Sequence, residues 1–215
     1  MEKILFFLVP TVLLSFAINR LIILTPLKHA YQFLVRPGII IHELSHYIAC
    51  LITFAEVKKV SLFQKDGGFV KYSSSKIPIL GDFIINIAPI IVGSILIILL
   101  SKKLNITISQ NPKTIIQDSI AIFKTNYAIF NFWIFLYAII TIGITLVPST
   151  KDITNIILPL ILIFAVLYFF RNSSYAGSIF QLFSDYGLYV VSPLFFVFTI
   201  VLSIYLVSRF VLRLS

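Results

Sequence analysis

Two histidines stand four residues apart in the sequence His42-Glu43-Leu44-Ser45-His46, with a glutamate directly after the first. On a helix, residues at i and i+4 lie on one face, one turn apart, so both imidazoles can bind the same metal ion. Zinc fits this donor set, with zinc–nitrogen distances of about 2.0–2.1 Å. Glu43 then lies next to a water molecule that the metal activates and can act as its general base. The pattern predicts metal-assisted hydrolysis.

A catalytic zinc needs a third protein ligand and one open position. Five aspartates are candidates: Asp66, Asp82, Asp118, Asp152 and Asp185. Asp152 closely follows Pro148, which ends or kinks a helix, and such a break can direct a carboxylate inward at membrane depth. The alternative is that Asp152 caps the helix that starts after it. The residues alone leave both interpretations open, and Asp82, near the start of an apolar run, is the reserve candidate.

The composition indicates where these residues must act. Apolar residues make up 59% of the 215 positions and charged residues only 12%, against about 25% in soluble domains. This excludes a soluble, disordered or fibrous protein and predicts an integral membrane protein, with helices favoured because the apolar runs are continuous. The net charge of +9 comes from lysines that mostly lie between these runs, so we expect contact with the lipid bilayer and no nucleic-acid partner.

Six apolar runs approach the roughly 20 residues that a helix needs to cross the hydrocarbon core. They cover about residues 4–24, 33–54, 77–100, 127–147, 153–170 and 187–207. We therefore predict an all-α integral membrane protein, a single polytopic domain over residues 1–215 with about six transmembrane helices. Its catalytic core covers about residues 33–155, and the spans at 4–24, 153–170 and 187–207 are additional. A cleaved signal peptide is the alternative for the first run, and residues 112–124 predict a short interfacial helix.

Lysine and arginine counts give the expected orientation. Nine fall on one side of the membrane and seven on the other, with Arg20 inside a span. The dense lysines of residues 55–76 favour the cytoplasm for their side. We therefore expect a multi-pass protein of the cell membrane with both termini in the cytoplasm.

The polar connection between the second and third spans has a β-hairpin pattern. Residues 57–64 have β character, residues 65–68 contain Gly67 and Gly68 for a turn, and residues 69–72 can return as a second strand. The exposed edge of a strand can pair with an extended peptide. The alternative is a plain basic loop.

The histidine motif has its own alternative, in which both imidazoles only bond to neighbouring helices and Glu43 is protonated. A glutamate in the middle of a membrane helix costs on the order of 3 kcal/mol, and such residues are usually functional. The membrane setting therefore favours the metal site.

Three segments in order resemble the site-2 protease family of intramembrane zinc metalloproteases. They are His42–His46, the segment Asp66-Gly67-Gly68-Phe69-Val70-Lys71, and residues 148–152, which stand in place of the family's Leu-Asp-Gly motif. The resemblance covers roughly residues 37–155. It implies that Asp152 is the third zinc ligand, and that the hairpin lies beside the site and binds substrate through Gly67, Gly68, Phe69 and Val70. The chain departs from the family pattern at Lys151 and Ile153, in Phe69 for tyrosine, and in lacking the usual asparagine before the proline.

Together these features predict an intramembrane zinc metalloprotease with one zinc ion per chain, bound by His42, His46 and Asp152, with Glu43 as the catalytic base. Its substrates are expected to be transmembrane segments of other membrane proteins. The alternative is an ion or metal transporter that uses the same histidines and aspartate. Transporters often contain an internal repeat, and the sequence shows none.

Overall fold

The computed structural model describes residues 2–62, 68–77, 79–104, 114–146, 152, 154–156, 161–162, 165, 168–169 and 173–214. The described part of the chain is mostly helical with one small sheet. The helices are α1 (Glu2–Leu24), η1 (Pro26–Ala30), α2 (Tyr31–Ile52), α3 (Leu80–Lys103), α4 (Ile115–Asn126), α5 (Phe130–Thr145) and α7 (Ser174–Leu214), and the strands are β1 (Val57–Ser61) and β2 (Phe69–Tyr72). Long apolar runs form helices because a helix satisfies its own backbone hydrogen bonds without water.

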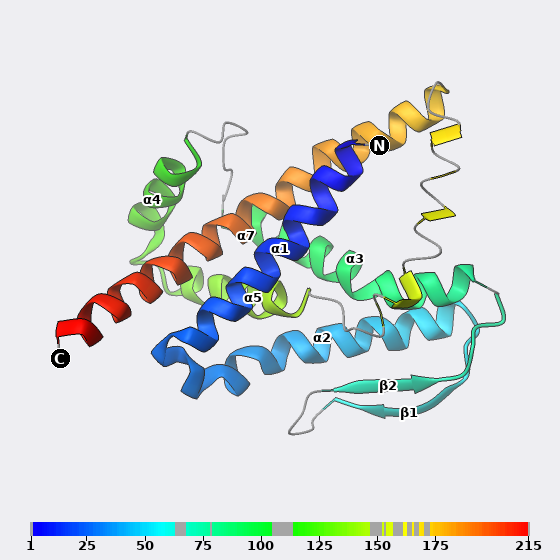
Figure 1. Ribbon diagram of the computed structural model, residues 1–215, viewed down its shortest axis with the longest axis horizontal. Coiled ribbons are helices and arrows are strands. Elements are labelled where there is room, and N and C mark those ends of the chain that lie inside the picture. The colour runs from blue at the N-terminus through cyan, green and yellow to red at the C-terminus, as the bar shows by residue number, and fades with distance from the viewer. Residues whose placement is uncertain are drawn as a thin grey trace.

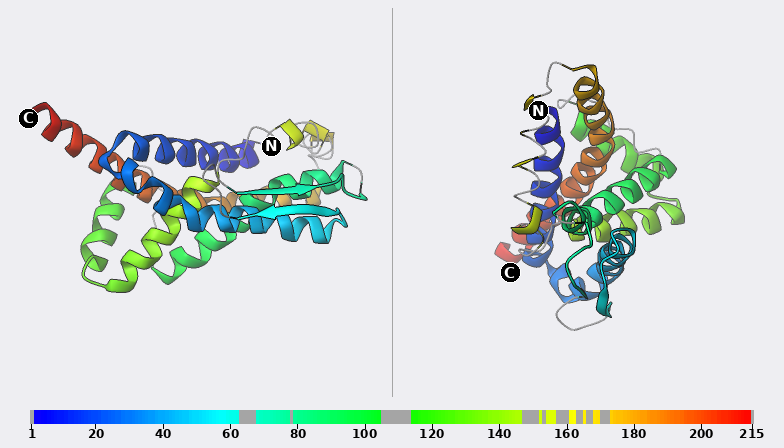
Figure 2. Two further views of the ribbon diagram at one scale, coloured as in Figure 1. Left: turned by 90° about the horizontal axis from the view of Figure 1, so that it is seen from below. Right: turned by 90° about the vertical axis from the view of Figure 1, so that its right-hand side faces the viewer.

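Helices α1 and α7 lie side by side and run in the same direction, so the beginning of α1 and the end of α7 lie far apart (Figures 1 and 2). Their contact belongs to one apolar core shared with α5. The core includes these buried side chains: Ile18, Ile22, Leu136, Ile139, Leu194 and Val197. Ser15 of α1 adds a buried hydrogen bond to the carbonyl of Gly143 in α5. The core thereby positions the end of α5, which borders the site described below.

A sharp bend separates α1 from α2. Thr25 accepts a hydrogen bond from the Leu27 amide and donates one to the Ile22 carbonyl, and Pro26 begins the short helix η1. Proline is favoured at the start of a helix because its missing N–H is not needed there. Across this break the chain turns by 98°.

The predicted hairpin is confirmed. Strands β1 and β2 pair antiparallel, with Val60 opposite Val70 and Ser61 opposite Phe69. Val70 and Tyr72 pack on a second apolar cluster, which contains Ala49, Cys50, Ala55, Ile85 and Ala88. The hairpin extends along α2 (Figure 1). Its predicted turn at residues 65–68 lies outside the described residues except for Gly68.

Two described helical segments are long and apolar enough to cross a membrane, Leu80–Lys103 and Tyr189–Phe210. The bent pair formed by α1 and α2 brings the number to three if it counts as one span, and α5 is apolar but has only 16 residues. The chain is thus a membrane protein. The larger number of six spans stays a prediction, and most of the predicted span at 153–170 lies outside the described residues. The interfacial helix expected at 112–124 corresponds to α4, described from Ile115.

Candidate metal centre

Helix α2 carries the histidine motif against α5 and α3. The approach of α2 to α5 is close because Gly38 has no side chain. A Cβ atom at this position would lie 2.2 Å from the Thr141 carbonyl oxygen. Small residues allow such backbone contacts between membrane helices. One turn further along α2, His42 consequently faces the end of α5.

Each imidazole is held by a backbone carbonyl from a different helix. The Nδ1 atom of His42 lies 2.8 Å from the Thr145 oxygen of α5, and the Nδ1 atom of His46 lies 2.8 Å from the Ile85 oxygen of α3. A carbonyl only accepts, so in both rings Nδ1 carries the proton and Nε2 keeps its lone pair. Such contacts fix the tautomer and the ring orientation of metal-binding histidines.

Asp152 completes the cluster. Its Oδ2 atom lies 4.0 Å from His42 Nε2 and its Oδ1 atom lies 3.7 Å from His46 Nε2. One ligand atom from each of these three residues lies within 4.8 Å of the others. In a tetrahedral site with bonds of about 2.0–2.1 Å, the ligand atoms are roughly 3.3 Å apart. The cluster therefore fits a metal ion after a small contraction.

Glu43 and the hairpin enclose a cavity beside the cluster, with a volume of about 250 Å³. Glu43 is only 9% exposed and interacts with the backbone amide of Val70. Gly68 leaves just enough room, because a Cβ atom there would lie 2.5 Å from Glu43 Cγ. The cavity is lined by His42, Glu43, His46, Gly68, Phe69, Val70, Lys71, Tyr72 and Asp152. A small ligand can thus lie between the cluster, a carboxylate and strand β2.

A chain of polar contacts joins the hairpin to the segment that contains Asp152. The Tyr72 hydroxyl donates to the Asn86 side-chain oxygen at 3.4 Å, and the Asn155 amide donates to the same oxygen at 3.5 Å. Asn86 also donates to the Asp82 carbonyl. Burial raises the pKa of Tyr72 to about 12, so its hydroxyl stays a donor at neutral pH. Asn86, near the beginning of α3, therefore links the hairpin to the segment that contains Asp152.

The structure brings together His42, Glu43, His46, Asp152, Gly68, Phe69 and Val70, whereas Gly67, Pro148 and Lys151 lie outside the described residues. The reserve candidate Asp82 does not join the cluster, because its carboxylate accepts the Ser75 amide at the start of α3. Sequence reasoning missed Lys71 and Tyr72 as cavity residues. Tyr72 follows Val70 on the same face of the strand, and this alternation was the available signal.

The chain matches the family model described as Peptidase M50B-like over residues 11–188. This range starts within α1 and ends within α7, and it includes the whole hairpin and the metal cluster. It confirms the resemblance to the site-2 protease family and is wider than the predicted 37–155. No curated protein and no solved structure matches the chain.

Proposed function

Because the chain belongs to the Peptidase M50B-like family, we propose that it is an intramembrane zinc metalloprotease that hydrolyses peptide bonds in or near transmembrane segments of other membrane proteins. The family implies a metallopeptidase. We further propose the identity of the metal, the residues that bind it and the class of substrate. The observation that carries it is the cluster of two imidazoles and a buried carboxylate beside Glu43.

The donor set supports zinc as the metal. His42 and His46 each offer Nε2, and Asp152 offers a carboxylate oxygen, which together supply the three protein ligands of a catalytic zinc site. The cavity beside these three residues would leave room for a water molecule or a peptide carbonyl at the fourth position of such a site. Zinc bound there would supply Lewis acidity, which would polarise a peptide carbonyl and lower the pKa of a bound water molecule to about 7. We expect one zinc ion per chain.

Glu43 is the proposed general acid–base residue. It lies on α2 between the two histidines and lines the cavity without joining the metal cluster. Its carboxylate accepts a proton from the attacking water and returns it to the leaving amine, a role that typically contributes 10²–10⁴-fold, or about 3–5 kcal/mol. The Val70 amide keeps the carboxylate orientated between the hairpin and the cluster.

Strand β2 is the proposed substrate-binding edge. A helical peptide has its carbonyls occupied by internal hydrogen bonds, so a segment must be extended before it is cleaved. Strands bind extended peptides through main-chain hydrogen bonds. Phe69 and Val70 line the cavity from β2, and Gly68 lines it directly before the strand. Gly67 precedes them in the proposed binding segment.

The location in the cell membrane also belongs to the proposal. The cytoplasmic placement of both termini stays a prediction from the lysine distribution. The alternative, with the two ends on opposite sides of the membrane, agrees with the parallel course of α1 and α7 (Figure 1). Accessibility labelling of a single cysteine at each end in sealed vesicles distinguishes the two arrangements.

The proposed protease function can be tested by removing the metal and then adding zinc back. Purified protein in detergent should cleave a transmembrane test peptide, lose the activity on chelation, and regain it with stoichiometric zinc. A metal transporter would instead move zinc across the membrane of sealed proteoliposomes without cleaving any peptide. Metal flux together with absent cleavage would replace the proposal by that alternative.

A further inference from the structure

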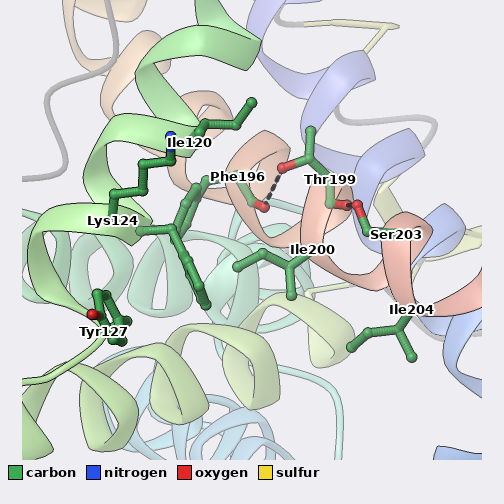
Figure 3. A pocket seen from close by; sticks show the side chains of 9 residues that line it. Ile120, Lys124, Tyr127, Phe196, Thr199, Ile200, Ser203 and Ile204 are labelled. Carbon is green, nitrogen blue, oxygen red and sulfur yellow. Dashed lines mark hydrogen bonds between the residues drawn. The ribbon is translucent and has the colours of Figure 1, made fainter. Parts of the chain in front are cut away.

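A second hollow lies between α4 and α7 and shares no residue with the metal cavity (Figure 3). Its volume is about 610 Å³. Ile120 and Phe123 of α4 form one wall, and Ile200 and Ile204 of α7 form the other. We refer to this hollow as the α4–α7 groove. None of the residues proposed to take part in peptide hydrolysis lines this groove.

The α7 wall has hydroxyl groups, but they do not face a ligand. Thr199 donates to the Phe196 carbonyl at 2.7 Å, and Ser203 donates to the Thr199 carbonyl at 2.8 Å. Figure 3 shows both hydroxyls turned to their own helix. The wall therefore acts as an apolar surface, suited to hydrocarbon.

One end of the groove is cationic. Lys124 lines it from the last turn of α4, and within the described part of the chain no carboxylate lies within 4.0 Å of its ammonium group. Tyr127 lies beside it, and the Trp133 indole donates to the Tyr127 carbonyl at 2.8 Å. Lysine, tyrosine and tryptophan together are typical of the level of the lipid headgroups. The groove thus combines an apolar interior with a positive charge at headgroup level.

The volume of the groove matches a lipid chain better than a protein helix. A helix with side chains is about 10–12 Å wide, so 610 Å³ would hold only about one turn of it. At the roughly 30 Å³ per water-sized group in a liquid, the same volume holds about 20 groups. That is roughly the number of carbon atoms in a single acyl chain.

We propose that the α4–α7 groove binds an anionic phospholipid, with an acyl chain between Phe123 and Ile200 and the headgroup phosphate at Lys124. Apolar packing alone gives no preference among lipids, because every lipid has hydrocarbon chains. The selectivity for a negative headgroup comes from Lys124. The proposal is independent of proteolysis and would hold for an inactive protein.

Photo-crosslinking tests this site directly. The full-length protein is placed in phosphatidylcholine nanodiscs that contain either phosphatidylglycerol or phosphatidylcholine with a photoreactive acyl chain, and the adducts are mapped by mass spectrometry. Phosphatidylglycerol should label α4 and α7 more strongly than phosphatidylcholine does. Lys124→Gln should reduce this preference roughly five-fold, the effect of one lysine near a membrane surface. The matched control Lys103→Gln, at an exposed lysine outside the groove, should keep it.

A second variant tests the groove itself. Ile200→Trp fills it and should reduce labelling by both lipids at α4. Equal preference in wild type and Lys124→Gln would overturn the proposal, as would labelling spread evenly over all lipid-facing helices. Crosslinks from the groove to a second copy of the chain or to the test peptide, in place of lipid, would also overturn it.

Discussion

The two histidines of the metal cluster bond to other elements, whereas Thr199 and Ser203 of α7 bond within their own helix. His42 reaches Thr145 and His46 reaches Ile85, contacts that join α2 to α5 and α3. On α7, Thr199 and Ser203 donate to carbonyls three or four residues earlier. The first kind of bond sets the position of one helix against another, and the second does not.

The difference shows where the fold must be accurate. Ligand atoms must lie within a few tenths of an ångström of their places to bind a metal well. Bonds between elements supply this accuracy around α2. The α4–α7 groove is lined mostly by apolar side chains, whose packing tolerates sliding and suits a flexible lipid chain. Substitutions around the metal cluster should therefore act by shifting the ligand atoms. Substitutions in the α4–α7 groove should act by changing its shape and charge.

The largest effect is expected from removing the carboxylate of the cluster. Asp152→Ala should lower zinc affinity by more than the roughly 10–100-fold that loss of an outer-shell partner costs. Asp82→Ala is the matched control, since its carboxylate bonds to the Ser75 amide and not to the cluster. Competition with a zinc chelator measures both. Equal affinity loss in the two variants would mean that Asp152 acts through the fold and not as a ligand.

The next effect concerns the cavity. In Gly68→Ala the added Cβ would lie 2.5 Å from Glu43 Cγ, so the carboxylate or the hairpin must shift. A displacement near 1 Å of a reacting group costs about 100-fold. We expect cleavage to fall by that order while zinc content stays at one per chain. Ser74→Ala, at an exposed position beyond β2, should leave turnover unchanged. If both variants cleave like wild type, the hairpin does not border the reaction.

A smaller effect is expected at the contact between α2 and α5. Gly38→Ala places a methyl group 2.2 Å from the Thr141 oxygen and must push the helices apart. Overpacking of this kind typically costs about 1–3 kcal/mol. The bond from His42 to Thr145 should lengthen as well, so zinc affinity should fall together with the free energy of unfolding in mixed micelles. A variant with unchanged stability and unchanged zinc affinity would show that the metal site does not need the close approach of α2 to α5.

The smallest effects distinguish the two kinds of hydrogen bond. Tyr72→Phe removes a bond between β2 and α3 and should cost about 0.6 kcal/mol, whereas Ser203→Ala should cost almost nothing. Because the pKa of Tyr72 is raised, its contribution is present below the ordinary value of about 10 and is lost only as the pH rises towards 12. Unfolding in mixed micelles at neutral pH measures both. A larger loss for Ser203→Ala would contradict the comparison.

Much of the site could be predicted because its residues carry distinctive chemistry. The spacing of His42 and His46 requires a helix, and the glycines before Phe69 indicate a turn. The carbonyls of Thr145 and Ile85 could not be predicted, since every residue has a carbonyl and only the packing selects which one faces a ring. The role of Gly38, and the close approach of Gly68 to Glu43, could not be predicted either, because a missing side chain shows its purpose only when its neighbour is known.

The helix boundaries differ for a related reason. The predicted span at 187–207 lies within α7, which extends over Ser174–Leu214. Polar residues such as Gln181 and Ser184 end the apolar run but do not end a helix, because hydropathy reports the surroundings and not the backbone. The three residues between α4 and α5 separate these helices without a strong turn signal, and the Trp133 indole donates a hydrogen bond back to the Tyr127 carbonyl.

The most direct measurement compares zinc content and cleavage in Glu43→Gln. Glutamine has the same shape but cannot take a proton from water, and Glu43 is not part of the metal cluster. The variant should bind one zinc per chain, as wild type does, and should cleave the transmembrane test peptide at least about 100-fold more slowly. Full activity with bound zinc would contradict the proposed chemistry, and loss of zinc would contradict the proposed ligands.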